Sequence, residues 1–112
     1  MKAIQLVPRP QEKRPFRANQ HFYIPEQGGC YVLSTFDETI VYIGLSKNLS
    51  RRFDEHLDSP KKTEPTRLGR AVWFHWLICK NLEQVERTWL NAHEISEGEL
   101  PCLNKHHSPL PM

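Results

Sequence analysis

Five polar side chains in this sequence have types and spacings that suit chemistry on a phosphate group. Arg52 and His56 are four residues apart, so on a helix they project from neighbouring points of one face. Tyr31 and Tyr42 fall in stretches of β-branched and aromatic residues that are typical of strands. Glu86 flanks the apolar stripe of a later predicted helix. A guanidinium, an imidazole, two phenols and a carboxylate are thus available to one site.

Each of these groups has a defined use in phosphoryl transfer. An arginine matches the spreading charge of a phosphate with fixed donors, and a carboxylate can hold a divalent cation that stabilises that charge. A phenol has an ordinary pKa of about 10 and becomes a base only where cationic neighbours favour the phenolate. The same residues also have ordinary structural roles, as strand aromatics, solvated helix charges and a helix-end cap. Residue type alone leaves both interpretations open.

The two tyrosines belong to a predicted β-hairpin. Residues 30–34 and 39–43 are rich in β-branched and aromatic side chains, and residues 36–38 form the turn between them. Gly44 is expected to end the second strand, because the backbone can turn sharply there. A third strand is predicted at residues 71–78, which are apolar and aromatic but too few for a confident helix.

The arginine and the histidine lie in the first of two predicted helices. It runs from an N-cap among residues 46–48 to about Leu57. Leu49, Phe53 and Leu57 recur every four residues, so this face packs against the sheet. The segments that follow are a polar loop and a short helical turn, at residues 60–65 and 66–70.

The second predicted helix carries the carboxylate. Asn81 is its predicted N-cap, and Gln84 three residues later completes a pattern like a capping box. Gly98 is the predicted stop. The apolar face comprises Leu82, Val85, Trp89, Ala92 and Ile95. The order of hairpin, helix, strand and helix predicts an α+β domain with one three-stranded sheet covered by helices.

Residues 1–25 differ in composition from the predicted domain, which comprises residues 26–112. They are rich in proline and basic side chains, so regular structure is not expected in them. We interpret them as an arm that docks on the domain through apolar side chains. Those available are Phe16, Phe22, Tyr23 and Ile24. Either the arm contacts phosphate through its basic residues or it is a solvated leader.

The composition of the 112 residues indicates one globular domain with a modest core. The net charge of +2 allows a nucleic-acid partner without requiring one. No apolar run suits a membrane span or a signal peptide, so a cytoplasmic protein without a membrane partner is expected. An odd number of cysteines without CxxC spacing predicts reduced thiols. A zinc site from Cys102 with His93, His106 or His107 is not favoured, because these residues do not form a four-ligand set.

Motifs along the chain resemble those of the GIY-YIG nuclease family. Gly29-Cys30-Tyr31 is followed after ten residues by Tyr42-Ile43-Gly44, as in the paired tripeptides that name the family. The run from Gly44 to His56 is similar to the family's glycine, Lys-Asn, arginine and histidine pattern. Glu86 falls in the late helix, and Pro101-Cys102-Leu103-Asn104 is similar to the family's closing Pro-x-Leu-Asn. Four elements in the right order make a strong match.

This resemblance implies a three-stranded antiparallel sheet flanked by helices and a metal-dependent endonuclease that hydrolyses phosphodiester bonds. Tyr31 would be the general base for a water nucleophile, with Tyr42 as the alternative. Tyr42 would otherwise position water or phosphate. Arg52, assisted by His56, would stabilise the transition state. Glu86 would hold one Mg²⁺ or Mn²⁺ ion.

Two of these assignments depend on a choice between neighbouring residues. Arg51 and Arg52 are adjacent, and Arg52 is assigned because it shares a helix face with His56. Glu83 and Glu86 are three residues apart, so we expect one near the site and the other more exposed. We assign Glu86 to the site.

The resemblance also implies that Asn104 orients groups around the site by hydrogen bonding. Cys30 replaces the family's middle isoleucine, a change that a buried strand should tolerate. Lys47 is a candidate for lowering the pKa of the base, although a solvated lysine is an equal interpretation. The basic residues expected to contact nucleic acid are Lys47, Arg51, Lys61, Lys62, Arg67 and Arg70.

The expected substrate is DNA, with RNA not excluded, and the number of protein copies is left open. The chain has room for few specificity elements, so weak sequence selectivity or recognition of a flap, branch or lesion is expected. The main alternative is a non-catalytic nucleic-acid-binding module on the same fold. A protein-interaction domain is the third, with Trp73, Trp76 and Trp89 as its contacts, although core packing is the favoured role for these residues.

Overall fold

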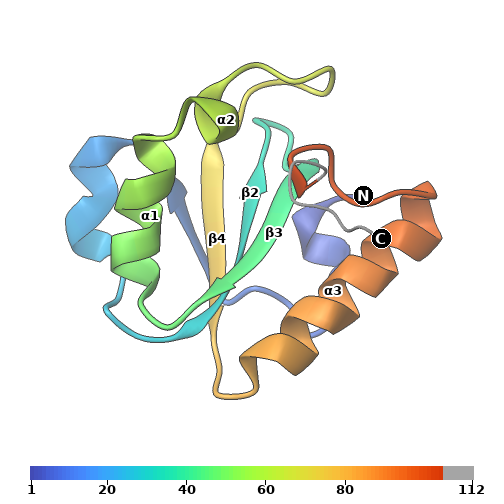
Figure 1. Cartoon of the computed structure of the whole chain (residues 1–112), viewed down its shortest axis with the longest axis horizontal. Coiled ribbons are helices and arrows are strands. Elements are labelled where there is room, and N and C mark those ends of the chain that lie inside the picture. The colour runs from blue at the N-terminus through green and yellow to red at the C-terminus, as the bar shows by residue number, and fades with distance from the viewer. Residues whose placement is uncertain (105–112) are drawn as a thin grey trace, which may run out of the picture.

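The computed structural model describes residues 1–104 of the chain, which form one four-stranded antiparallel sheet with helices on both faces (Figure 1). The strands are β1 (Glu12–Pro15), β2 (Gly29–Ser34), β3 (Ile40–Ser46) and β4 (Trp73–Ile78), in the order β1-β4-β2-β3. The helices are η1 (Ala3–Gln5) and η2 (Ala18–Tyr23), both 3₁₀, and α1 (Leu49–Leu57), α2 (Pro60–Thr63) and α3 (Leu82–Glu97). The predicted α+β class with an antiparallel sheet is confirmed.

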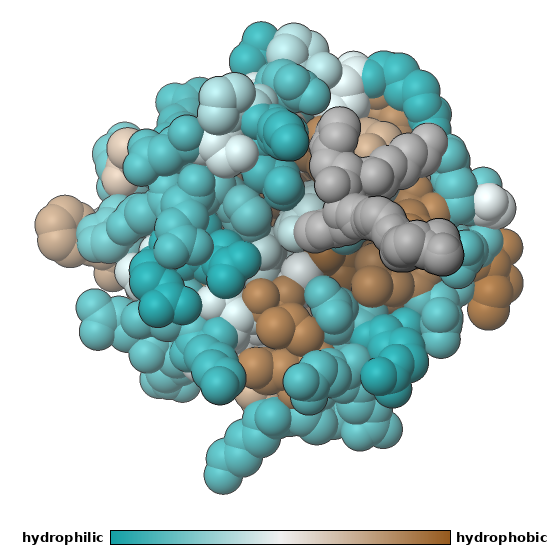
Figure 2. Space-filling view, viewed as in Figure 1, coloured by the Kyte–Doolittle hydropathy of each residue, from teal (hydrophilic) through white to brown (hydrophobic). Residues whose placement is uncertain are grey.

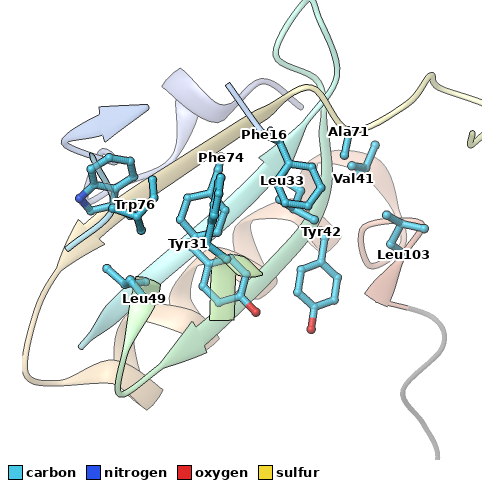
Figure 3. Packing of buried hydrophobic residues seen from close by; sticks show 12 residues of the cluster. Phe16, Tyr31, Leu33, Val41, Tyr42, Leu49, Ala71, Phe74, Trp76 and Leu103 are labelled. Atoms are coloured by element: carbon cyan, nitrogen blue, oxygen red, sulfur yellow. The ribbon is translucent and has the colours of Figure 1, made fainter. Parts of the chain in front are cut away.

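The central strand β2 separates two hydrophobic clusters. All of its residues are buried, and they alternate between the two faces of the sheet. On the face covered by α1, here the α1 face, Tyr31 and Leu33 pack with Phe74 and Trp76 (Figure 3). The cluster on the opposite face, here the α3 face, comprises Ala3, Leu6, Cys30, Val32, Ile40, Ile43, Val85 and Trp89. Polar groups on β2 are therefore held firmly between two packed layers.

Both long helices begin and end near their predicted boundaries. The Asn48 side chain caps α1 by accepting a hydrogen bond from the Arg51 backbone N–H at 3.1 Å. At the start of α3, the Asn81 amide instead donates to the Gln84 side chain at 3.3 Å, so the expected capping box does not form. Gly98 ends α3 with a φ of +77°, which glycine adopts without strain. No helix among residues 1–104 combines the length and apolar character of a membrane span.

The predicted apolar stripe of α3 is only partly correct. Val85 and Trp89 are buried, whereas Ile95 is exposed. His93 is buried in the same part of the helix, and its Nδ1 is hydrogen-bonded to the Glu99 carbonyl at 2.7 Å. A polar residue can occupy this position because the chain after α3 folds back and supplies an acceptor.

The expectation that residues 1–25 lack regular structure is wrong. Residues 12–15 form β1, which pairs with the outer edge of β4 and adds a fourth strand to the three predicted. An edge strand tolerates proline, because only one side of it needs backbone donors. Phe16 and Ile24 are buried in the α1-face cluster, as the docking hypothesis requires, while Phe22 is exposed.

Three further local predictions need correction. β3 continues through Gly44 to Ser46 instead of ending at the glycine. The expected loop at residues 60–65 contains the short helix α2, which begins with a proline as helices commonly do. Residues 66–70 form a tight turn closed by backbone hydrogen bonds between Thr66 and Gly69, not a helical turn.

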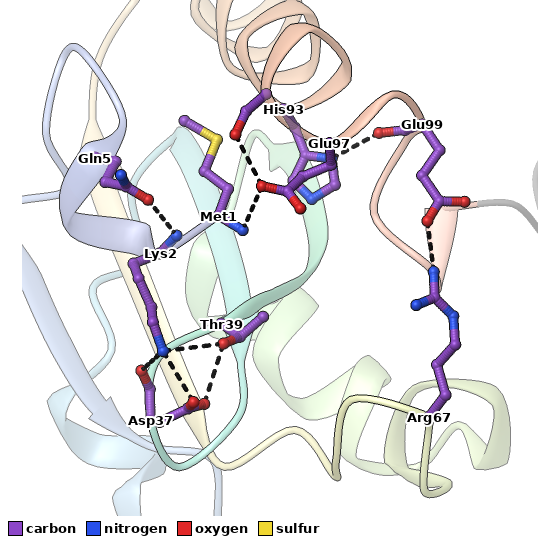
Figure 4. A network of polar contacts seen from close by, with 10 residues as sticks. Met1, Lys2, Gln5, Asp37, Thr39, Arg67, His93, Glu97 and Glu99 are labelled. Carbon is purple, nitrogen blue, oxygen red and sulfur yellow. Dashed lines mark hydrogen bonds and ion pairs between the residues drawn. The ribbon is translucent and has the colours of Figure 1, made fainter.

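Charged groups tie the N-terminus to the hairpin turn and to the end of α3 (Figure 4). The Lys2 ammonium binds the Asp37 carboxylate at 2.8 Å, and this contact lowers the pKa of that carboxyl. The Met1 amino group lies 2.8 Å from a Glu97 carboxylate oxygen. These ion pairs join segments that are distant in sequence on the α3 side of the sheet.

The buried imidazole of His75 on β4 makes the stability of the protein sensitive to acid. Its Nε2 lies 2.7 Å from Ser34 Oγ, and burial lowers its pKa to about 4. The native state therefore keeps this residue neutral, while the unfolded chain takes up a proton below about pH 6.5. We expect the free energy of unfolding to fall as the pH drops from 6.5 towards 4, with His75 contributing up to about 1.4 kcal/mol per pH unit.

Urea denaturation at several pH values between 6.5 and 4 measures how the free energy of unfolding depends on pH. His75→Gln keeps a hydrogen-bonding side chain without the titration, so its unfolding free energy should change less steeply with pH. An equal slope in the variant and the wild type would show that His75 does not carry the effect.

Candidate active site

Side chains from β2, β3 and α1 converge at the edge of the α1-face cluster. The Tyr31 hydroxyl lies 2.6 Å from His56 Nε2, so the two groups share a hydrogen bond. The centroid of the Tyr42 ring lies 6.0 Å from that of Tyr31 and 5.3 Å from that of His56. Figure 3 shows the hydroxyl groups of both tyrosines at the same margin of the cluster. The structure thus brings together three of the side chains that the sequence singled out.

The position of the Tyr31 ring depends on Gly44, which lies opposite it in the β2–β3 pairing. A Cβ atom on Gly44 would lie 2.6 Å from the Tyr31 hydroxyl oxygen and 2.9 Å from a ring carbon of Tyr42. Such separations are far shorter than van der Waals contact. Glycine is therefore needed inside β3 to leave room for the phenol, and not to turn the chain.

Burial keeps both partners of the Tyr31–His56 hydrogen bond neutral. Desolvation, with the charges of Lys62 and Arg52, lowers the pKa of His56 to about 3. Desolvation, with a contribution from Tyr42, raises the pKa of Tyr31 well above its usual value. A neutral imidazole has one acceptor nitrogen, so the phenol can donate to His56 Nε2. In the free protein the proton therefore stays on the phenol, and the imidazole accepts the hydrogen bond.

Of the two adjacent arginines, Arg52 acts on the tyrosines. Its charge favours a lower pKa for Tyr31 and Tyr42, although burial outweighs it and the pKa of both phenols is raised. Its Nε is buried and makes no hydrogen bond within residues 1–104, although a Glu55 carboxylate oxygen lies 3.0 Å away. Arg51 is exposed and lies 3.6 Å from the same carboxylate. Arg52 is thus ion-paired with Glu55 but lacks a hydrogen bond at Nε, and a guanidinium is a group that binds phosphate.

On α3, the Glu86 carboxylate lies within electrostatic range of the two tyrosines. Its charge contributes to the raised pKa of Tyr31 and of Tyr42. The pKa of Glu86 is itself raised, chiefly by burial and then by the nearby Glu83. Within residues 1–104, the Glu86 carboxylate has neither an ion pair nor a hydrogen bond, whereas Glu83 is exposed to solvent. A partly buried carboxylate without a partner is a fitting ligand for a cation.

Residues 1–104 do not provide a zinc-type ligand set beside Glu86. Residues 1–104 contain no group of three or more His, Cys, Asp or Glu side chains that could hold a metal together. Zinc needs such a set, whereas Mg²⁺ commonly takes one or two carboxylates together with water and phosphate oxygens. Among the zinc ligands considered above, His93 is bound to a backbone carbonyl, and His106 and His107 lie outside the described residues.

Asn104 binds the backbone of β3 rather than the other site residues. Its Oδ1 accepts from the Ile43 N–H at 2.9 Å, and its Nδ2 donates to the Ile43 carbonyl at 2.8 Å. The neighbouring Leu103 N–H donates to the Val41 carbonyl at 2.9 Å. The end of the described chain thus continues the pairing along the free edge of β3, and Asn104 fixes the strand between Tyr42 and the glycine that follows.

Only part of the predicted basic surface lies at this site. Lys62 lies 4.7 Å from the centroid of the Tyr42 ring, a contact that was not predicted because it depends on α2. Arg67 forms an ion pair with Glu99, and Arg70 donates to a backbone carbonyl of α2. Figure 2 shows a predominantly hydrophilic surface over α1 and α2. The remaining predicted contacts have exposed side chains: Lys47, Arg51 and Lys61.

Comparison with known proteins identifies related sequences. A family model described as the GIY-YIG catalytic domain matches residues 27–96. UvrABC system protein C from Mesoplasma florum is 33% identical over 49 residues, which cover 44% of this chain and 8% of that protein. The same protein from Mycoplasmoides gallisepticum is 29% identical over 73 residues, which cover 65% of this chain and 12% of that protein. The chain therefore matches only a small part of each relative's length.

Solved structures of the GIY-YIG N-terminal endonuclease domain of UvrC from Thermotoga maritima have a similar fold. The domain bound to magnesium, its catalytic divalent cation, is 19% identical over 77% of this chain and 92% of that chain, with a TM-score of 0.54. A point mutant bound to its catalytic divalent cation is 18% identical over 76% and 90% of the two chains, with a TM-score of 0.53. At this level of identity, the similarity shows the fold alone.

Gly44→Ala tests whether the glycine makes room for the Tyr31 phenol. The added methyl would collide with the phenol, so we expect a loss of about 1–3 kcal/mol in the free energy of unfolding. Urea denaturation measures the loss. Gly28→Ala is the matched control, because its Cβ would meet nothing closer than 3.5 Å. Equal stability of the two variants would contradict this role of Gly44.

Replacing the Glu86 carboxylate should stabilise the protein in the absence of a metal ion. Because the pKa of Glu86 is raised, the ionised group opposes folding at neutral pH, and Glu86→Gln removes this cost. After allowance for solvent screening, we expect a gain of up to about 1 kcal/mol in the free energy of unfolding. Denaturation in EDTA measures the gain, with Glu94→Gln at an exposed position of the same helix as the control. A variant less stable than wild type would contradict the assignment.

Proposed function

The chain belongs to the GIY-YIG family, and on this basis we propose that it is a nuclease that hydrolyses phosphodiester bonds in DNA with one divalent cation. The observation that carries the proposal is the 2.6 Å hydrogen bond between the Tyr31 hydroxyl and His56 Nε2, close to Arg52 and to the isolated Glu86 carboxylate. These groups supply a proton acceptor, a phosphate ligand and a cation ligand. The similar UvrC domain is described as an endonuclease and binds magnesium.

Glu86 would hold the cation, Mg²⁺ or Mn²⁺. Its carboxylate suits such an ion because burial disfavours the free charge and no cationic side chain among residues 1–104 is paired with it. When bound, the ion stabilises the charge that develops on the phosphate and on the leaving oxygen. Binding would also relieve the repulsion between Glu86 and Glu83.

Tyr31 would accept the proton of the attacking water while passing its own proton to His56. The water O–H bond breaks as the oxygen bonds to phosphorus, the bond from phosphorus to the leaving oxygen breaks, and His56 becomes protonated at Nε2. This relay avoids a free phenolate, whose formation is opposed by the raised pKa of Tyr31. The negative phosphate favours the protonated imidazole, although burial alone disfavours it.

The remaining residues would bind phosphate or hold the site in shape. Arg52 would stabilise the transition-state charge, and its buried Nε forms no hydrogen bond among residues 1–104, although it is ion-paired with Glu55. Tyr42 would position water or phosphate, with Lys62 adding positive charge beside its ring. Asn104 is a positioning residue, because it acts through the backbone of Ile43.

The proposed substrate is DNA cut with weak sequence selectivity or at a structural feature. Sequence-specific recognition needs many contacts to base edges. The described chain adds only β1 and short helices to the sheet and its two long helices, and this leaves little surface for such contacts. RNA cleavage would show that the site does not discriminate the sugar.

Plasmid nicking with metal and site variants tests the proposal. With Mg²⁺ we expect supercoiled DNA to be nicked, and Glu86→Gln and Arg52→Ala each to slow nicking by on the order of 100-fold or more. Arg51→Ala is the matched control, because this neighbour is exposed, and it should change the rate only a few-fold. EDTA should abolish nicking.

Two results would contradict the nuclease proposal or its assignments. Undiminished nicking by Glu86→Gln would show that another residue holds the ion. DNA binding by folded protein, without cleavage of plasmid or branched DNA in either metal, would favour a non-catalytic binding module.

A further inference from the structure

A hollow of about 350 Å³ lies beside the hairpin turn, and its lining includes neither tyrosine of the candidate active site. Its wall includes Phe36 of the turn, Trp73 at the start of β4, and the side chains of Arg17, Asn19 and Gln20 from the N-terminal segment. We call it the Phe36 hollow. A space of this size holds a small ligand such as one nucleobase.

Phe36 offers an aromatic face for stacking. Its side chain is 80% exposed at the tip of the β2–β3 hairpin, although phenylalanine is usually among the most buried residues. The Trp73 indole N–H donates to the Phe36 carbonyl at 3.2 Å and fixes the backbone of the turn. An exposed ring on a fixed turn loses little freedom when it stacks on a ligand.

Gln20, in the wall of the hollow, has a buried side-chain oxygen without a donor. Within residues 1–104, the buried side-chain nitrogen and oxygen atoms without a hydrogen-bond partner are Arg52 Nε, in the candidate active site, and Gln20 Oε1. The amide nitrogen of Gln20 makes one long contact of 3.4 Å, to the Asn19 side chain. Buried acceptors are normally satisfied, so the Gln20 amide is weakly held by the protein and can turn to hydrogen-bond a ligand in the hollow.

Basic side chains connect the Phe36 hollow with the candidate active site. Arg17 in its wall forms no ion pair within residues 1–104, and no acidic side chain lines the hollow. On the other side of Phe36, a second hollow of about 330 Å³ includes Arg70, which donates to a backbone carbonyl of α2 at 3.0 Å. Also from α2, Lys62 reaches the Tyr42 ring. A strand of nucleic acid could follow this path.

We propose that the Phe36 hollow binds an unpaired nucleobase of the nucleic-acid substrate. The Phe36 ring stacks on the base, the Gln20 amide turns toward the hollow and accepts an N–H from the edge of the base, and Arg17 meets the adjoining phosphate. This inference rests on the proposed nuclease function and narrows it to substrates with a single-stranded flap, branch or gap. A guanidinium without an ion pair beside an exposed aromatic ring matches a nucleotide better than the apolar centre of a protein interface.

Binding measured in EDTA tests the hollow without cleavage. Fluorescence anisotropy compares a labelled duplex that carries a single-stranded flap with the same duplex fully paired. We expect Phe36→Ala to weaken flap binding about 5- to 100-fold and to change paired-duplex binding less than about 2-fold. Phe22→Ala is the matched control, because Phe22 is 91% exposed and does not line the hollow, and it should change neither affinity. Gln20→Leu, which removes the acceptor at similar volume, should also weaken flap binding selectively.

Unchanged flap affinity in Phe36→Ala, or equal losses for both DNAs, would overturn the proposal. A changed sedimentation coefficient without a change in flap affinity would overturn it too, and would assign Phe36 to contacts between protein copies. Plasmid nicking separates the two hypotheses. If the wild type nicks plasmid but Phe36→Ala leaves flap binding unchanged, only the proposal for the Phe36 hollow is refuted. If Phe36→Ala selectively loses flap binding but the wild type cleaves no DNA, only the nuclease proposal is refuted.

Discussion

The close approach of the Tyr31 ring to Gly44 fixes the strand register on which the site depends. In the β2–β3 pair, Tyr31 lies opposite Gly44 and Leu33 lies opposite Tyr42, so both phenols are on the α1 face. A slip of one residue would move Tyr42 to the α3 face. One tyrosine–glycine pair thus specifies the pairing of two strands, the packing over them and the meeting of a phenol with the imidazole of His56.

Two groups near this pair are incompletely satisfied by the protein itself. Tyr31 and His56 are hydrogen-bonded to each other, but the Arg52 Nε has no hydrogen bond among residues 1–104, and the Glu86 carboxylate has neither a hydrogen bond nor an ion pair there. Burial of polar groups without partners costs stability. The sheet can sustain this cost because its central strand is packed on both faces. The Arg52 guanidinium and the Glu86 carboxylate are then the groups with which the proposed site would bind phosphate and a cation.

Local patterns predicted the inner strands, the two long helices and the caps at Asn48 and Gly98, because these features depend on nearby residues. Family motifs singled out the tyrosines, the histidine and the acid in advance. β1 could not be predicted, because its proline and those that precede it argue against a strand and its pairing is provided by distant β4. For the same reason the roles of Gly44 and Asn104, and the contact of Lys62 with a tyrosine, required the tertiary structure.

The pairing of β1 with β4 has a consequence for how the chain folds. Glu12 pairs with Trp76, so the N-terminal strand is synthesised early but joins the sheet only after β4 has been made. With 4 residues, β1 is also a short edge segment, of the kind that opens before a core does. Whenever it is detached, β4 presents a row of free backbone donors and acceptors. The N-terminal segment therefore acts as a cover that keeps this edge from pairing with a strand of another molecule.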